Sequence, residues 1–125
     1  MTIRNGMPEK GFAHIWKAFG FSLAGLRVLL GENAARMEIV FFACVLSAFA
    51  LSGAPFVAYA IQFGLFVFIL MIEAINTAIE LIVDRTSPEI SEYGKHTKDV
   101  ASFAVMCSLI IFGGHALWVV THAWL

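Results

Sequence analysis

The positive charges of this chain are confined to two segments, and this distribution limits what the chain can fold into. No Lys or Arg lies between Met37 and Asp84, and none follows Lys98. The chain is 60% hydrophobic and 14% charged, whereas a soluble domain averages about 45–50% apolar and about 25% charged residues. Too few charges remain to cover a water-facing surface, so we expect an integral membrane protein. A net charge of −1 without a basic stripe argues against a nucleic-acid partner.

Hydropathy predicts an all-α membrane protein formed by a single domain, residues 1–125. A transmembrane helix needs about 20 apolar residues to cross the ~30 Å hydrocarbon core of a bilayer. Three segments reach or exceed this length, and Gly53-Ala54-Pro55 separates the first from the second. We expect a surface helix at about 11–30 and transmembrane helices at about 33–52, 55–84 and 99–124.

The surface helix is expected from aromatic and basic residues at helical spacing. Phe12, Trp16 and Phe19 recur along it, with Lys17 and Arg27 among them. This pattern is typical of an amphipathic helix in the membrane interface, with Trp at the level of the lipid headgroups. An ordinary amphipathic helix packed on the bundle would show the same pattern.

The orientation of the chain follows from the same charge distribution. Every Lys and Arg lies either before Met37 or between residues 85 and 98. The positive-inside rule places both segments in the cytoplasm and the C-terminus outside. The charged side chains are therefore expected at or near the cytoplasmic side of the membrane.

Polar side chains share one stripe of the second transmembrane helix. At 100° per residue, Asn76 lies about −60° from Glu73, Thr77 about +40° and Glu80 about −20°. Carboxylates near a bilayer usually face a polar cavity, a partner or a metal, and crowded carboxylates repel unless a cation neutralises them. From chemistry alone, Glu73 is explained equally well as a structural carboxylate bonded to a neighbouring helix. We expect Asp84, at the end of the stripe, to pair with the adjacent Arg85.

Further polar clusters are predicted at the same side of the membrane, and their members are Glu32, Asn33, Arg36, Glu38, Lys98, Asp99 and Ser102. Acids with a nearby Lys suit Mg²⁺ bridged to phosphate oxygens, and phosphoryl transfer needs a metal, a cation and a base. The chain has no GxxxxGK[ST] loop and no HRD or DFG signature. A kinase built from this chain would use none of the common soluble kinase folds.

The segments GENAARME, EAINTAIELIVDR and EYGKHTKDVAS resemble the prokaryotic diacylglycerol kinase family. The resemblance covers nearly the whole chain, from Gly11 onward. It implies a homotrimer in the bacterial inner membrane, with active sites between subunits at the cytoplasmic interface. It also implies ATP as the phosphate donor, with Mg²⁺.

The resemblance assigns roles to individual residues. The proposed catalytic base corresponds to Glu73, with Asn76 in a supporting role. The metal-binding residues correspond to Glu32 and Glu80. The nucleotide-binding positions correspond to Glu32, Glu80, Glu89, Lys98, Asp99, Phe21 and His14. The lipid-binding positions correspond to Arg27, Arg36, Glu38, Glu73 and Ser102.

Three positions depart from the family's pattern. Phe21 stands where the best-known members have Tyr, Ser91 stands where they have His, and His14 replaces a basic residue. In the family these positions correspond to contacts with adenosine.

The favoured function is therefore ATP-dependent phosphorylation of a membrane lipid alcohol. Diacylglycerol is the favoured acceptor, and undecaprenol is the alternative lipid. A small oligomeric proton-coupled transporter is the alternative from another class, because intramembrane acids also build ion pathways. A carrier needs acids near the bilayer midplane, reachable from both sides. The clustering of charge at the cytoplasmic side favours the enzyme.

Overall fold

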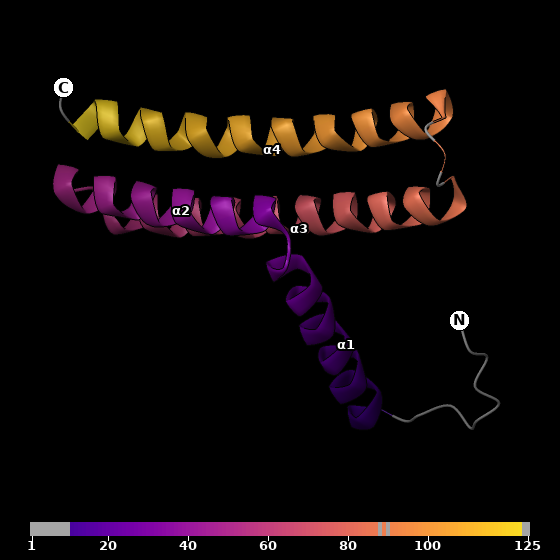
Figure 1. The fold of residues 1–125 in the computed structure, drawn as a ribbon. Helices are drawn as coiled ribbons and strands as arrows, with labels where there is room; N and C mark the ends of the chain where they lie inside the picture. The colour runs from indigo at the N-terminus through magenta and orange to yellow at the C-terminus, as the bar shows by residue number, and fades with distance from the viewer. Residues whose placement is uncertain (1–10, 88, 90, 124–125) are drawn as a thin grey trace.

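The computed structural model describes residues 11–87, 89 and 91–123, and within them the chain forms four α-helices without a β-strand. The helices are α1 (Phe12–Leu30), α2 (Asn33–Ser52), α3 (Phe56–Thr86) and α4 (Glu92–Ala123). Helices α2, α3 and α4 run side by side, and α1 leaves this bundle at a steep angle (Figure 1). The all-α fold with one shorter helix and three long ones is confirmed.

Local sequence signals explain where the first helices end. Gly53 adopts a left-handed conformation, with φ 69°, and caps the C-terminus of α2. Pro55 directly precedes α3, at a position where its missing N–H costs no helical hydrogen bond. The observed bounds of α1 and α2 therefore lie within one residue of those predicted.

Helix α4 begins earlier than predicted, at Glu92 rather than near Asp99. The Ser91 hydroxyl accepts a hydrogen bond from the Gly94 N–H at 3.0 Å, which is the geometry of a helix N-cap. Most of the polar segment predicted as a loop is therefore helical. The predicted end of this helix, at residue 124, lies outside the described residues.

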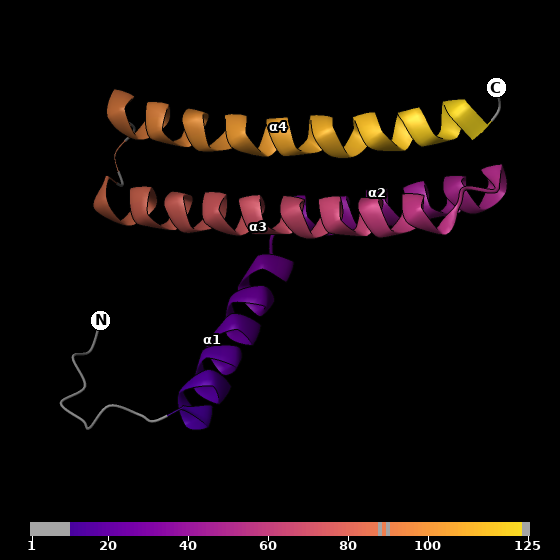
Figure 2. The same cartoon turned by 180° about the vertical axis from the view of Figure 1, so that it is seen from behind.

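Three helices, α2, α3 and α4, are long and apolar enough to cross a membrane. The 20 residues of α2 extend about 30 Å and the 31 residues of α3 about 46 Å. Since the hydrocarbon core is ~30 Å thick, α3 exceeds it. The last turns of α3 and the first turns of α4 extend past the start of α2 (Figures 1 and 2).

The two ends of the bundle differ, and we name them by their connections. At the turn end, Gly53–Pro55 joins α2 to α3; at the loop end, α3 ends and α4 begins. The apolar core lies in the part of the bundle nearer the turn end, and its buried members are Val45, Phe49, Ala58, Ile69, Phe112, Ala116 and Val119. This core holds α2, α3 and α4 together and so positions the polar residues nearer the loop end.

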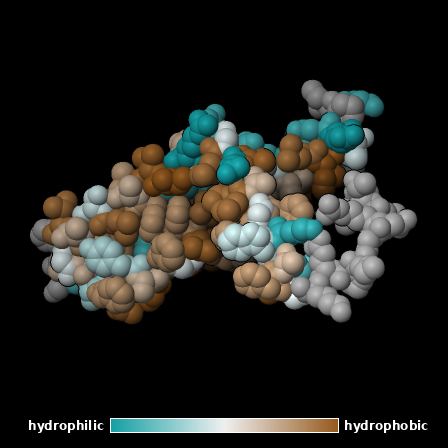
Figure 3. All heavy atoms as spheres, turned by 90° about the horizontal axis from the view of Figure 1, so that it is seen from below, coloured by the Kyte–Doolittle hydropathy of each residue, from teal (hydrophilic) through white to brown (hydrophobic). Residues whose placement is uncertain are grey.

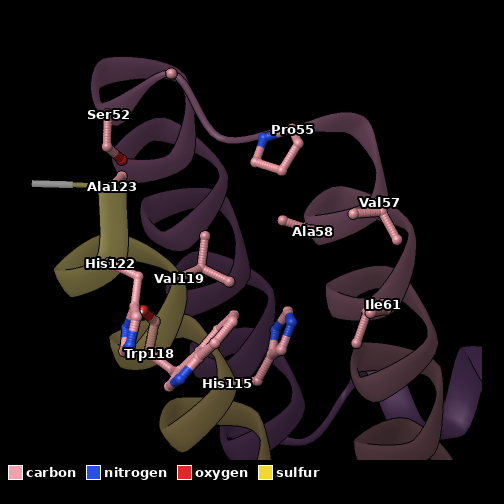
Figure 4. Close-up of a pocket in the computed structure, with 11 residues that line it drawn as sticks. Ser52, Pro55, Val57, Ala58, Ile61, His115, Trp118, Val119, His122 and Ala123 are labelled. Atoms are coloured by element: carbon pink, nitrogen blue, oxygen red, sulfur yellow. The ribbon is translucent and has the colours of Figure 1, made fainter. Parts of the chain in front are cut away.

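A buried polar contact also joins α3 to α4. Gln62 is fully buried, its Nε2 donates to the Phe112 carbonyl at 3.2 Å, and its Oε1 contacts Nδ1 of His115. Beside it is a cavity of about 350 Å³ at the turn end, lined by His115, Trp118 and His122 among others (Figure 4). His115 thus connects α4 to α3, whereas His122 bonds within α4, and both histidines lie far along α4 from the acids of α3. Interhelical bonds of this kind stabilise membrane bundles.

Helix α1 presents most of its surface outward. Of its residues only Leu29 is buried, whereas Phe12, Trp16 and Phe19 are exposed and stack along one side. Apolar side chains also cover much of the bundle surface seen from below (Figure 3). An exposed apolar surface of this extent suits contact with lipid or with another subunit.

Candidate active site

Buried polar side chains gather where the start of α2 meets the second half of α3. On α3, Glu73 is 4% exposed and Thr77 is 7% exposed, and Asn76 is also buried. On α2, Glu38 is 8% exposed. Helical periodicity places Glu73, Asn76 and Glu80 on one side of α3, and the fold turns this side toward α2.

Four glutamates form a connected group, which we call the glutamate cluster: Glu32, Glu38, Glu73 and Glu80. Glu73 interacts electrostatically with each of the other three. Asn76 Nδ2 donates to Glu80 Oε1 at 3.1 Å and holds that carboxylate in the group. The structure therefore brings together residues of two helices that lie far apart in the sequence.

Three buried oxygens of this region lack a hydrogen-bond partner within the described part of the chain. They are Glu38 Oε2, Glu73 Oε2 and Asn76 Oδ1. A buried polar atom without a partner is costly. A ligand that supplies hydrogen-bond donors or positive charge would satisfy these oxygens.

The donor set suits a metal that arrives with a substrate. Within the described residues, no group of three His, Cys, Asp or Glu side chains is arranged to hold a metal ion. Mg²⁺ is usually bound by one or two carboxylates together with substrate phosphates, rather than by an all-protein cage. Glu32 and Glu80 fit this pattern, whereas a closed structural metal site does not.

A second polar site lies at the loop end, between α3 and α4. It is a cavity of about 250 Å³, which we call the loop pocket, and its lining includes Asp84, Ser87, Glu89, Lys98 and Asp99. Three of the residues predicted to bind the nucleotide, namely Glu89, Lys98 and Asp99, therefore share one pocket.

Lys98 connects the loop pocket to the glutamate cluster. Its ammonium forms an ion pair with Asp84 across the two helices and also interacts with the charge of Glu80. The prediction that Asp84 pairs with Arg85 is wrong, because α4 starts early enough to place Lys98 opposite Asp84. One turn before Lys98, Lys95 pairs with Asp99 at 2.8 Å.

Other predicted site residues lie apart from these groups in the single chain. His14, Phe21 and Arg27 are exposed on α1, and Ser102 is exposed one turn after Lys98 on α4. Arg36 donates from Nε to the Leu30 carbonyl at 2.9 Å, so it braces the connection between α1 and α2. Within one chain, no contact joins His14, Phe21 or Arg27 of α1 to the glutamate cluster among the described residues, whereas Arg36 lies one turn after Glu32.

An apolar groove runs between α1 and α3 beside the cluster. It has a volume of about 860 Å³, and its lining includes Leu26 and Leu29 of α1 and Met71, Ala74 and Thr77 of α3. Helical periodicity places Thr77 at the edge of the polar stripe, but only the position of α1 reveals that this edge borders a groove. Sequence reasoning assigned Thr77 no role.

The profile of the family described as prokaryotic diacylglycerol kinase matches residues 20–120. The chain belongs to this family. The match includes the glutamate cluster, the loop pocket and the residues of α1 and α3 that line the groove, and it begins after His14. Membership in the prokaryotic diacylglycerol kinase family makes the chain a lipid kinase.

Individual members of the family match most of the chain. A diacylglycerol kinase of Sinorhizobium sp is 46% identical over 119 residues, which are 94% of this chain and 87% of the relative. A diacylglycerol kinase of Escherichia coli (strain K12) is 32% identical over 108 residues, covering 81% of this chain and 84% of the relative. One from Helicobacter pylori (strain J99) is 33% identical over 105 residues, covering 82% and 81%.

Proposed function

We propose that this chain transfers the γ-phosphate of ATP to the free hydroxyl of diacylglycerol and so forms phosphatidic acid. Family membership and the names of its relatives support the reaction. The observation that carries the proposal is the buried carboxylate of Glu73, which lies among other acids and beside a groove suited to acyl chains.

The chemical step requires a base. The acceptor oxygen forms a bond to the γ-phosphorus, the bond from that phosphorus to the bridging oxygen breaks, and ADP leaves. Because an alcohol holds its proton tightly at neutral pH, a positioned base must accept it during the attack. We assign this role to Glu73, whose Oε2 has no partner within the described residues. Asn76 supports it by holding Glu80 in place.

The nucleotide is held by the remaining acids together with Lys98. Glu32 and Glu80 would hold Mg²⁺, and Lys98 and Asp99 would contact the nucleotide from the loop pocket. Mg²⁺ bound there supplies positive charge to the phosphate oxygens. When ATP binds, Lys98 leaves Asp84 and pairs with a phosphate group. Because the ion pair with Asp84 is exposed to solvent, breaking it costs little free energy.

We propose a homotrimer with active sites between subunits. The separation of predicted site residues supports it, since Phe21 and Arg27 on α1 and Ser102 on α4 lie outside the cluster of their own chain. The exposed apolar side of α1 provides surface for such contacts. In this arrangement one subunit supplies the glutamate cluster of a site, and a neighbouring subunit supplies the lipid-binding residues Arg27 and Ser102.

We place the chain in the bacterial inner membrane, with the loop end in the cytoplasm. The distribution of Lys and Arg supports this orientation. ATP is then available on the side where the loop pocket opens. The acceptor lipid enters from the bilayer along the groove between α1 and α3.

The proposal is tested by identifying the product. Purified full-length protein in phosphatidylcholine vesicles is given labelled ATP, Mg²⁺ and either dioleoylglycerol or undecaprenol. We expect labelled phosphatidic acid from dioleoylglycerol at a higher kcat/KM than labelled undecaprenyl phosphate. A higher kcat/KM for undecaprenol would show that undecaprenol, and not diacylglycerol, is the preferred acceptor.

A further inference from the structure

The groove between α1 and α3 contains a hydroxyl that the proposed reaction does not use. We propose that Thr77 is a positioning residue, whose hydroxyl donates a hydrogen bond to an ester carbonyl of the acceptor lipid. The site then prefers acylglycerols over lipid alcohols that lack an ester. This inference rests on the proposed function, because it assigns a contact within the same site.

The first observation is the polarity of the groove lining. Among the described residues that line the groove, only Ser22 and Thr77 carry polar side chains. The Ser22 hydroxyl donates to the Ala18 carbonyl at 3.1 Å within α1. Thr77 therefore has the one lining hydroxyl whose hydrogen is not already donated within these residues.

The second observation is the absence of the usual local hydrogen bond. Hydroxyls in helix interiors commonly bond to the carbonyl one turn earlier, and Ser47, Thr86, Thr97 and Thr121 do so here. Within the described part of the chain, the Thr77 hydroxyl makes no such bond. The residue is nonetheless only 7% exposed. The Thr77 oxygen is not one of the fully enclosed oxygens without a partner, so a ligand in the groove can reach the hydroxyl. A ligand that accepts its hydrogen gains one hydrogen bond.

The third observation is the position of Thr77 between the groove and the base. On the helical wheel Thr77 lies about 40° from Glu73, and Ala74, which lines the groove, lies about 100° from Glu73 on the same side. Along the axis of α3, Thr77 lies one turn, about 6 Å, from Glu73, so it is within reach of a lipid whose chains lie in the groove and whose hydroxyl is at Glu73. The group at Thr77 is then the part of the lipid that links the chains to the hydroxyl.

The chemistry of that linking part identifies the lipid class. In an acylglycerol, ester carbonyls stand between the chains and the free hydroxyl, and a carbonyl accepts a hydrogen bond from Thr77 without occupying the attacking oxygen. A polyprenol has no oxygen besides its hydroxyl. A site with a buried donor discriminates against a ligand that cannot pair with it.

The test compares two lipids that differ only in these carbonyls. Full-length protein in vesicles is assayed with 1,2-dioleoylglycerol and with its dialkyl ether analogue, in which each carbonyl is a methylene group. We expect Thr77→Val to raise KM for the diacyl lipid about 3- to 10-fold, the effect of one hydrogen bond. The kcat for the diacyl lipid and both constants for the ether lipid should stay near the wild-type values.

Two further variants separate the hydrogen bond from packing. Thr77→Ser keeps the hydroxyl and should restore a near-wild-type KM for the diacyl lipid. Thr121→Val makes the same change near the turn end of α4 and should leave both lipids unaffected. Equal effects of Thr77→Val on the two lipids, or an unchanged KM for both, would overturn the role of Thr77. Failure of the wild-type protein to phosphorylate dioleoylglycerol would instead overturn the proposed function.

Discussion

Lys98 of α4 and Asp84 of α3 form an ion pair across the two helices, and both side chains line the loop pocket. The two side chains are 41% and 64% exposed, so the pair contributes little to stability. Its consequence is orientation. The pair holds the Lys98 ammonium at the loop pocket, where it also interacts with the charge of Glu80.

The ion pair leads to a prediction about ATP binding. Lys98→Ala should raise KM for ATP about 10- to 100-fold, because a charge-assisted hydrogen bond to phosphate is lost. The KM for the lipid should change little, and the measurement is steady-state kinetics with each substrate varied in turn. Asp84→Asn is the matched control, since it breaks the same ion pair but keeps the lysine. A similar rise in both variants would show that the ion pair, rather than a phosphate contact, accounts for the effect.

A second prediction concerns Mg²⁺. Glu32→Gln and Glu80→Gln should each raise the Mg²⁺ concentration for half-maximal activity by about tenfold or more. Even the loss of a residue that only hydrogen-bonds to a metal ligand weakens metal binding by about this factor. The measurement is a Mg²⁺ titration at fixed free ATP and saturating lipid. Glu92→Gln, in the exposed first turn of α4, serves as the control and should behave as wild type. Unchanged titrations in both cluster variants would remove these residues as ligands.

A third prediction concerns the sharing of a site between chains. Protomers with Glu73→Gln and protomers with Arg27→Ala should each have low activity at limiting diacylglycerol, and mixing them should restore part of it, because Arg27 lies outside the glutamate cluster of its own chain. If each site takes these residues from different subunits, about a quarter of the sites in a random 1:1 mixture contain both wild-type residues. The readout is the specific activity of co-refolded mixtures against unmixed controls. Activity no greater than the average of the unmixed controls would place both residues in one chain.

Sequence patterns predict the helices well where the stop signals are local. Gly53 and Pro55 separate α2 from α3 in the structure as the sequence indicates. The start of α4 was mispredicted because hydropathy reports burial in lipid and not helicity. The polar turns from Glu92 to Lys98 are helical, but they extend past the start of α2 (Figure 1).

Contacts between helices are harder to predict from one sequence. The periodicity of α3 places Glu73 and Glu80 on one side, but it cannot show that Glu38 of α2 faces them. The same limit applies to Thr77, whose significance depends on where α1 lies. The predicted partner of Asp84 is its sequence neighbour Arg85, but its actual partner, Lys98, lies on the next helix and could not be identified without the structure.

Glu73 is proposed to accept the proton of the lipid hydroxyl, and the kcat of Glu73→Gln tests this role most directly. Glutamine keeps the size and most of the hydrogen bonding of the side chain but cannot serve as the base. At saturating ATP and dioleoylglycerol we expect kcat to fall about 10²–10⁴-fold, with ATP affinity and oligomer size near those of wild type. A near-normal kcat combined with weakened ATP binding would contradict the account and assign Glu73 to the nucleotide site.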